Sequence, residues 1–104
     1  PYEEMWMLVV DGRNRFRTAR RVAQGGLHGC SIRPRDVLRV AVAEAAYAFV
    51  LVHNHPSGDP TPSRADIEMT AEVKTAAAAL GIVLHDHLII GNGRHLSFRR
   101  EGLL

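Results

Sequence analysis

Six consecutive apolar residues, Tyr47 to Val52, are followed directly by His53. A short and uninterrupted apolar run is typical of a central strand covered on both faces, because a strand with one wet face alternates polar and apolar residues. The chain is therefore expected to fold around a sheet whose central strand stops at a histidine. At 104 residues it is long enough for one hydrophobic core and too short for two, so we expect a single domain over residues 1–104.

Two pairs of adjacent strands, each joined by a glycine-containing turn, are expected at the two ends of the chain. The first pair is an apolar run ended by Asp11-Gly12 and followed by an alternating segment, which predicts a β-hairpin. The last two strands are joined by Gly91-Asn92-Gly93, a favourable tight turn. The four predicted strands are Met5 to Val10, Asn14 to Val22, Ile82 to Ile90 and His95 to Phe98.

Two helices are expected between these strand pairs. Pro34 suits the first turn of one helix, Ser63 opens the other, and Gly81 ends it. Both segments carry apolar residues at three- and four-residue spacing, which predicts faces packed on the sheet. The order ββαβαββ predicts an α/β fold, a mixed β-sheet flanked by two main helices. The predicted inward residues are Val37, Leu38, Ala41, Val42, Ala45 and Ala46 in the first helix and Ile67, Thr70, Val73, Ala77 and Leu80 in the second.

His53 and His55 form a pair at the end of the apolar strand. Residues two apart in an extended chain project from the same face, about 6.5 Å apart at the backbone, so two imidazoles can converge on one ion. A bare His-x-His pair is more often two partly exposed histidines than a metal site. The residues that follow change this balance.

Asp66 lies eleven residues after His55, in the first turn of the second helix. The loop from Pro56 to Pro62 contains three prolines, and its stiffness lowers the entropic cost of bringing Asp66 back to the histidines. Two imidazole nitrogens and one carboxylate leave a fourth position open, as in catalytic zinc sites. Magnesium and calcium prefer oxygen ligands, so a set with two imidazole nitrogens is expected to bind them weakly.

The same aspartate has a purely structural interpretation. Ser63-Arg64-Ala65-Asp66 is the outline of a helix capping box, in which Ser63 and Asp66 satisfy the first backbone N–H groups. The two interpretations are compatible, since a serine in this turn can cap the helix and still present its hydroxyl to the site.

The segment from His53 to Ser63, followed by Asp66 and Thr70, resembles the signature of the RadC family. It contains the His-x-His-Pro and Ser-x-x-Asp pattern of JAB/JAMM (MPN-type) metallopeptidases. The resemblance covers nearly the whole chain. It also takes in Glu3-Glu4-Met5-Trp6, Arg33-Pro34-Arg35-Asp36-Val37, Asp86-His87-Leu88-Ile89-Ile90-Gly91 and Ser97-Phe98.

This resemblance implies a JAB/MPN architecture, similar to that of cytidine deaminases, and a zinc-dependent hydrolase acting on amide bonds of a protein or peptide. It implies that His53, His55 and Asp66 bind Zn²⁺ and that Ser63 helps to stabilise the oxyanion. A glutamate near the first strand is implied as general base. The family pattern favours Glu3, and Glu4 remains the alternative.

Composition narrows the setting of this chemistry. Cys30 is the only cysteine, so no internal disulfide forms, and no apolar stretch is long enough to span a bilayer. A cytoplasmic protein without membrane association is expected. The chain begins at Pro1 without a methionine, and we expect it to be a fragment of a longer protein.

The remaining motifs have weaker functional readings. His85-Asp86-His87 repeats the His-x-His spacing without a following acid, so a supporting hydrogen-bond role beneath the metal site is favoured over a second metal. His28 and His95 are expected in loops or on the surface, and Cys30 as a small buried thiol.

Three alternatives to the peptidase hypothesis stay open. The first is an accessory module for DNA repair with weak nucleic-acid association, suggested by Arg13, Arg15 and Arg17 on one face of the second strand with Arg20 and Arg21 nearby; the net charge of +2 is only a mild bias. The second is a zinc deaminase, which lacks support because the Pro-Cys-x-x-Cys element is absent. The third is a metal-binding domain without turnover.

Overall fold

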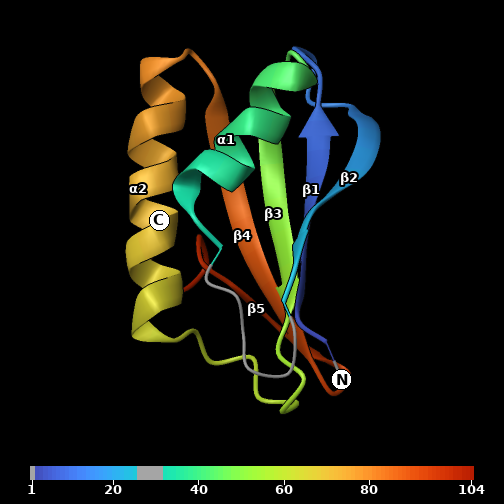
Figure 1. The fold of residues 1–104 in the computed structure, drawn as a ribbon, viewed down its shortest axis with the longest axis vertical. Helices are drawn as coiled ribbons and strands as arrows, with labels where there is room; N and C mark the ends of the chain where they lie inside the picture. The colour runs from blue at the N-terminus through green and yellow to red at the C-terminus, as the bar shows by residue number, and fades with distance from the viewer. Residues whose placement is uncertain (1, 26–31) are drawn as a thin grey trace.

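The computed structural model describes residues 2–25 and 32–104. Five strands and two helices follow one another in the predicted order ββαβαββ, and the α/β class is confirmed (Figure 1). His28 was predicted in a loop or on the surface, and Cys30 as a small buried thiol. Both residues lie outside the described residues. The elements are β1 (Glu4–Val10), β2 (Phe16–Gln24), α1 (Pro34–Ala43), β3 (Ala48–Asn54), α2 (Arg64–Ala79), β4 (Val83–Gly91) and β5 (Arg94–Ser97).

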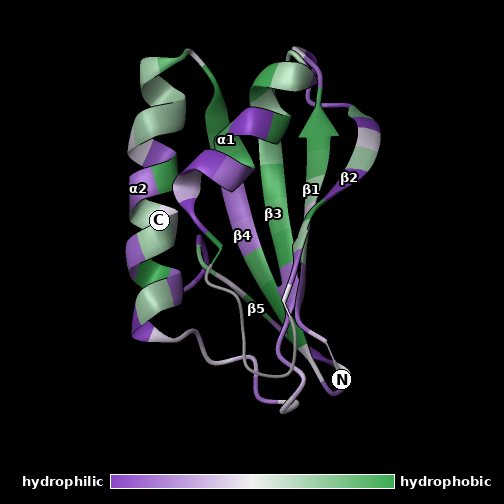
Figure 2. Cartoon of the chain, viewed as in Figure 1, coloured by the Kyte–Doolittle hydropathy of each residue, from purple (hydrophilic) through white to green (hydrophobic). Residues whose placement is uncertain are grey.

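The sheet is mixed and has the strand order β2-β1-β3-β4-β5. β3 is its central strand, antiparallel to β1 and parallel to β4. Met5 pairs with His53, so the start of β1 lies beside the end of β3. This register brings the N-terminal residues next to the His-x-His pair. Figure 2 shows β3 hydrophobic over most of its length and hydrophilic where it ends.

Both helices cover the same face of the sheet, and they contact each other. The buried residues of β1 and β3 alternate along each strand, and those on the helix side pack with Val37, Ala41, Val73 and Ala77 in one core. In Figure 1, α1 crosses in front of β3 and β4, with α2 alongside. The expectation that β3 is covered on both faces is therefore wrong. Val50 and Val52 lie on the other face of β3, which no helix of the described residues covers, and both are partly exposed.

The helix boundaries correct several predicted core positions. α1 ends at Ala43, and Ala45 has a positive φ of 48°, so it belongs to the turn after the helix. Val40 is buried where Val42 was expected, and Val42 is 56% exposed. In α2 the predicted Thr70, Val73 and Ala77 are buried. Leu80 forms the C-cap and is 56% exposed, because the chain turns away there before Gly81.

None of the helices within residues 2–25 and 32–104 is long and apolar enough to cross a membrane.

Gly91, at the end of β4, lies in close contact with the loop that follows the histidines. A Cβ atom at this position would lie 2.7 Å from the backbone carbonyl carbon and oxygen of Gly58. Gly58 in turn donates its N–H to the carbonyl oxygen of His55. A glycine is therefore required where β4 passes beneath the histidine loop.

Replacing Gly91 with alanine is expected to lower the free energy of unfolding by about 1–3 kcal/mol, because backbone atoms of the loop must move to admit the methyl group. Urea denaturation of the variant measures this loss. Gly12→Ala is the matched control, since its Cβ would meet only the Tyr47 ring at 3.7 Å, an ordinary contact. Equal stability of the two variants would contradict the close approach.

Candidate metal centre

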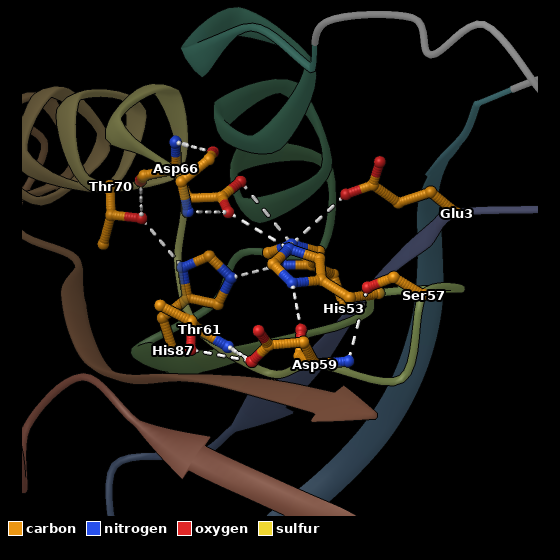
Figure 3. Close-up of polar contacts among 10 residues, drawn as sticks. Glu3, His53, Ser57, Asp59, Thr61, Asp66, Thr70 and His87 are labelled. Carbon is orange, nitrogen blue, oxygen red and sulfur yellow. Dashed lines mark hydrogen bonds and ion pairs between the residues drawn. The ribbon is translucent and has the colours of Figure 1, made fainter. Parts of the chain in front are cut away.

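Four side chains converge at the end of the sheet where β3 meets the start of α2. The Nε2 atoms of His53 and His55 lie 3.1 Å apart. Asp66 places Oδ1 3.5 Å from His53 Nε2 and Oδ2 3.1 Å from His55 Nε2. Glu3 Oε1 lies 3.3 Å from His53 Nε2 (Figure 3). One ligand-type atom from each residue falls within 4.8 Å of the others, so the four form one cluster.

β3 and the following loop fix the two histidines. β3 continues through His53 to Asn54, two residues further than predicted, and this keeps the His53 side chain on the buried helix side of the strand. His55 follows the strand and donates its backbone N–H to the carbonyl of Ile90. Its ring Nδ1 lies 2.9 Å from the carbonyl oxygen of Asp59. A carbonyl oxygen only accepts, so Nδ1 carries the hydrogen and Nε2 faces the cluster with its lone pair.

Asp66 reaches the cluster from the first turn of α2. Ser63 Oγ accepts the N–H of Asp66, and Asp66 Oδ2 accepts the N–H of Ser63, so the predicted capping box is present. Burial alone would raise the pKa of Asp66, but the hydrogen bond from the Ser63 backbone and the neighbouring His53 outweigh it and lower this pKa. The cap therefore holds an ionised carboxylate against the two imidazoles.

A second layer of hydrogen bonds lies beneath His53. His53 Nδ1 is 2.7 Å from His87 Nε2, and His87 Nδ1 is 2.8 Å from Thr70 Oγ1. The Thr70 hydroxyl donates to the carbonyl oxygen of Asp66, at 2.6 Å. His87 is fully buried and its ring stacks on Phe98 at a centroid distance of 4.5 Å. The expected supporting role of His87 is thus visible in the structure. Thr70 was predicted as an inward residue of the second helix and as part of the family signature, but not as a hydrogen-bond partner of His87; its position one helical turn after Asp66 was the available signal.

The donor and acceptor inventory of the cluster suits a divalent cation. Two carboxylate groups and two imidazole Nε2 atoms, all of them able to act as ligands, face one another. Zinc–nitrogen bonds of about 2.0–2.1 Å in a tetrahedral site place ligand atoms roughly 3.3 Å apart, close to the separations of His53, His55 and Asp66. Nitrogen and carboxylate ligands together fit zinc better than magnesium or calcium. The residues present therefore fit the implied ion.

The structure separates the two candidate glutamates. Glu3 faces the cluster on the side of the sheet that also carries Met5, because it precedes Met5 by two residues. Burial, and then the charge of Asp66, raise the pKa of Glu3. Glu4 points elsewhere: its Oε1 accepts a hydrogen bond from the indole of Trp6. Of the two glutamates, only Glu3 has its carboxylate in the cluster.

The other sequence candidates lie away from the cluster. His85 contacts Asn14, and Asp86 accepts hydrogen bonds from the Ser97 hydroxyl and the backbone N–H groups of His87 and Arg99, so the second His-x-His pair does not form a second metal group among the described residues. His95 is exposed, as expected.

The predicted arginine face of the second strand is wrong in part. Arg13 and Arg15 precede β2, which begins only at Phe16, because Asp11 accepts both of their backbone N–H groups and holds a turn there. Arg15 also pairs with the Asp11 carboxylate, while Arg17 and Arg20 both pair with Glu44.

Two buried histidines make the stability of the metal-free protein depend on pH. Burial lowers the pKa of His53 to about 4 and that of His87 to about 3, from 6.5. Well above pH 6.5 both histidines are neutral in the folded and in the unfolded protein. Below it the unfolded chain takes up protons that the folded protein does not, so stability falls as the pH drops.

We expect each of these histidines to remove about 1.4 kcal/mol of stability per pH unit between pH 6.5 and roughly 4. Denaturant unfolding at a series of pH values measures the slope, which His87→Gln should reduce by about half. His95→Gln, at an exposed position on β5, serves as the control and should leave the slope unchanged. A flat profile over this range would contradict the neutral, buried pair.

Comparison with known proteins identifies the family of this chain. The family model described as a RadC-like JAB domain matches residues 1–103. A UPF0758 protein of Rhodobacter capsulatus is 52% identical over 104 residues, which cover 100% of this chain and 49% of that protein. A UPF0758 protein of Ruegeria pomeroyi is 47% identical over 102 residues, 98% of this chain and 46% of that protein. The chain thus spans about half the length of these curated relatives.

A mixed sheet with a helix pair on one face, ending in a His-x-His and aspartate cluster, defines a domain of the JAB/MPN class. Within that class, this chain belongs to the RadC-like JAB domain family.

Proposed function

We propose that the domain is a zinc-dependent hydrolase that cleaves amide bonds in proteins or peptides. The convergence of Glu3, His53, His55 and Asp66 carries this proposal. Three of these residues supply the ligand set of a catalytic zinc site, and the fourth is an acid with a raised pKa beside it. This is the arrangement required for activating water next to a carbonyl group.

His53, His55 and Asp66 would hold the ion. Zinc in such a site supplies Lewis acidity, polarising a carbonyl and lowering the pKa of a water to roughly 7. Glu3 accepts the proton of the attacking water and delivers it to the leaving amine. Its raised pKa suits the first half of this transfer, because the carboxylate gains a proton more readily than an exposed glutamate does.

Ser63 would assist at the oxyanion. Its Oγ already accepts the Asp66 N–H, which leaves the hydroxyl hydrogen to donate. One well-placed donor to a developing oxyanion contributes about 3 kcal/mol in comparable sites. The capping box therefore gives Ser63 a fixed position from which it serves both the helix and the reaction.

The chemistry is tested by incubating the zinc-loaded protein with a panel of peptides and of lysine isopeptides. We expect cleavage of at least one amide class, its loss on treatment with a chelator, and its return when zinc is added back. A protein that carries stoichiometric zinc and cleaves nothing in the panel would instead be a metal-binding domain without turnover. The substrate is expected in the cytoplasm, in keeping with the single cysteine.

Nucleic-acid association receives less support than hydrolysis. Arg15 and Arg17 of the predicted arginine face, and Arg20 nearby, pair with acidic side chains, which reduces the positive charge available to phosphates. A steep fall of DNA affinity with salt, independent of zinc, would favour this rival.

A further inference from the structure

His87 and Thr70 form a hydrogen-bonded pair that touches the cluster only through His53 and Asp66. Both side chains are buried, at 0% and 1% exposure. Polar groups are costly to bury among apolar residues such as Phe98 unless each hydrogen is used. The pair therefore needs an explanation beyond filling the core, which an apolar residue would do at lower cost.

The direction of every hydrogen in this chain of contacts follows from its last member. The Asp66 carbonyl oxygen can only accept, so the Thr70 hydroxyl donates its one hydrogen to it. Thr70 Oγ1 must then accept from His87 Nδ1. His87 touches no carboxylate with its ring, so the neutral ring is the one that fits, and its Nε2 is left as an acceptor. His53 Nδ1 must donate to it.

We infer that Thr70 and His87 are positioning residues that fix His53 in the tautomer with hydrogen on Nδ1, so that its Nε2 lone pair points at the cation. The effect on metal binding rests on the metal site of the proposed function. The tautomer assignment rests only on the hydrogen bonds. His55 reaches the same tautomer by a different device, the backbone carbonyl of Asp59. A side-chain relay is needed for His53 because its Nδ1 faces the buried layer between the sheet and α2.

If the direction of these hydrogen bonds were reversed, a hydrogen on His53 would block the metal site. If Thr70 lacked its hydroxyl, the Nδ1–H of His87 would have no acceptor, and the ring would favour hydrogen on Nε2 instead. His53 would then have to accept at Nδ1 and carry its own hydrogen on Nε2. That hydrogen would point at His55 and Asp66, where the cation should lie.

The tautomers are read directly by ¹⁵N NMR of the metal-free, histidine-labelled protein. We expect the Nδ1–H form for both His53 and His87 in the wild type, the Nε2–H form for both in Thr70→Val, and return to Nδ1–H in Thr70→Ser. An Nε2–H signal from His53 in the wild type would overturn the inference. This readout needs neither zinc nor activity, so it stands apart from the fate of the proposed function.

Zinc affinity, measured by competition with a chelator, gives the second test. Partners of metal-bound histidines typically contribute 10–100-fold in affinity, so we expect a loss in this range for His87→Leu and about tenfold for Thr70→Val. His87→Gln retains an acceptor near the Nε2 position and should bind within a few-fold of wild type. Val73→Ala, a buried change one turn further along α2, controls for loosened packing and should not alter affinity. Wild-type affinity in folded His87→Leu would overturn the inference.

Discussion

Asp66→Asn is expected to lower the affinity for zinc more than about a hundredfold while leaving the domain folded. The direct ligand should exceed the 10–100-fold effect typical of residues that only support a ligand. The amide oxygen of asparagine still accepts the N–H of Ser63, so the helix cap is largely kept. What is lost is the negative charge between the two imidazoles. Chelator competition measures the affinity, and circular dichroism verifies the fold.

His85→Ala is the matched control for that experiment. It removes a histidine from the other His-x-His pair, whose ring contacts Asn14 and not the cluster. Its zinc affinity should equal that of the wild type. Equal losses for Asp66→Asn and His85→Ala would mean that zinc binds through histidines generally, which would contradict the assigned site.

Glu3→Gln is expected to reduce the rate of amide hydrolysis by about 10²–10⁴-fold, the usual contribution of a general base. The amide cannot accept the proton of water, yet it preserves the size of the side chain. Zinc binding should persist, since His53, His55 and Asp66 remain. Single-turnover cleavage by the zinc-loaded variant measures the loss, and metal analysis confirms that the site is filled.

Glu4→Gln provides the comparison, because it alters the neighbouring acid that bonds to Trp6. Its hydrolysis rate should stay close to that of the wild type. The opposite ranking, with Glu4→Gln inactive and Glu3→Gln active, would transfer the role of base to Glu4.

Local signals in the sequence predicted most of the fold. The apolar run before His53, the glycine turns and the Ser63 cap each act over a few neighbouring residues, and all appear in the structure. The main failure is tertiary. Whether β3 is covered on one face or two depends on where the helices pack, and a run of six apolar residues does not carry that information.

The cluster could be anticipated in part. The spacing of His53, His55 and Asp66 predicted that they meet, because a stiff loop joins a strand end to a helix start. Glu3 is fifty residues from His53 in the chain, and only the pairing of Met5 with His53 brings it there. The choice between Glu3 and Glu4 depended on which face of β1 meets the helices. The alternation of polar and apolar residues could not decide this, since apolar residues line both faces of β1.

A crystal structure of the zinc-loaded protein, with anomalous scattering recorded at the zinc absorption edge, tests the central claim most directly. One zinc ion is predicted within about 2.0–2.2 Å of Nε2 of His53, Nε2 of His55 and a carboxylate oxygen of Asp66. An anomalous peak elsewhere, or none at this cluster under conditions of excess zinc, would contradict the account.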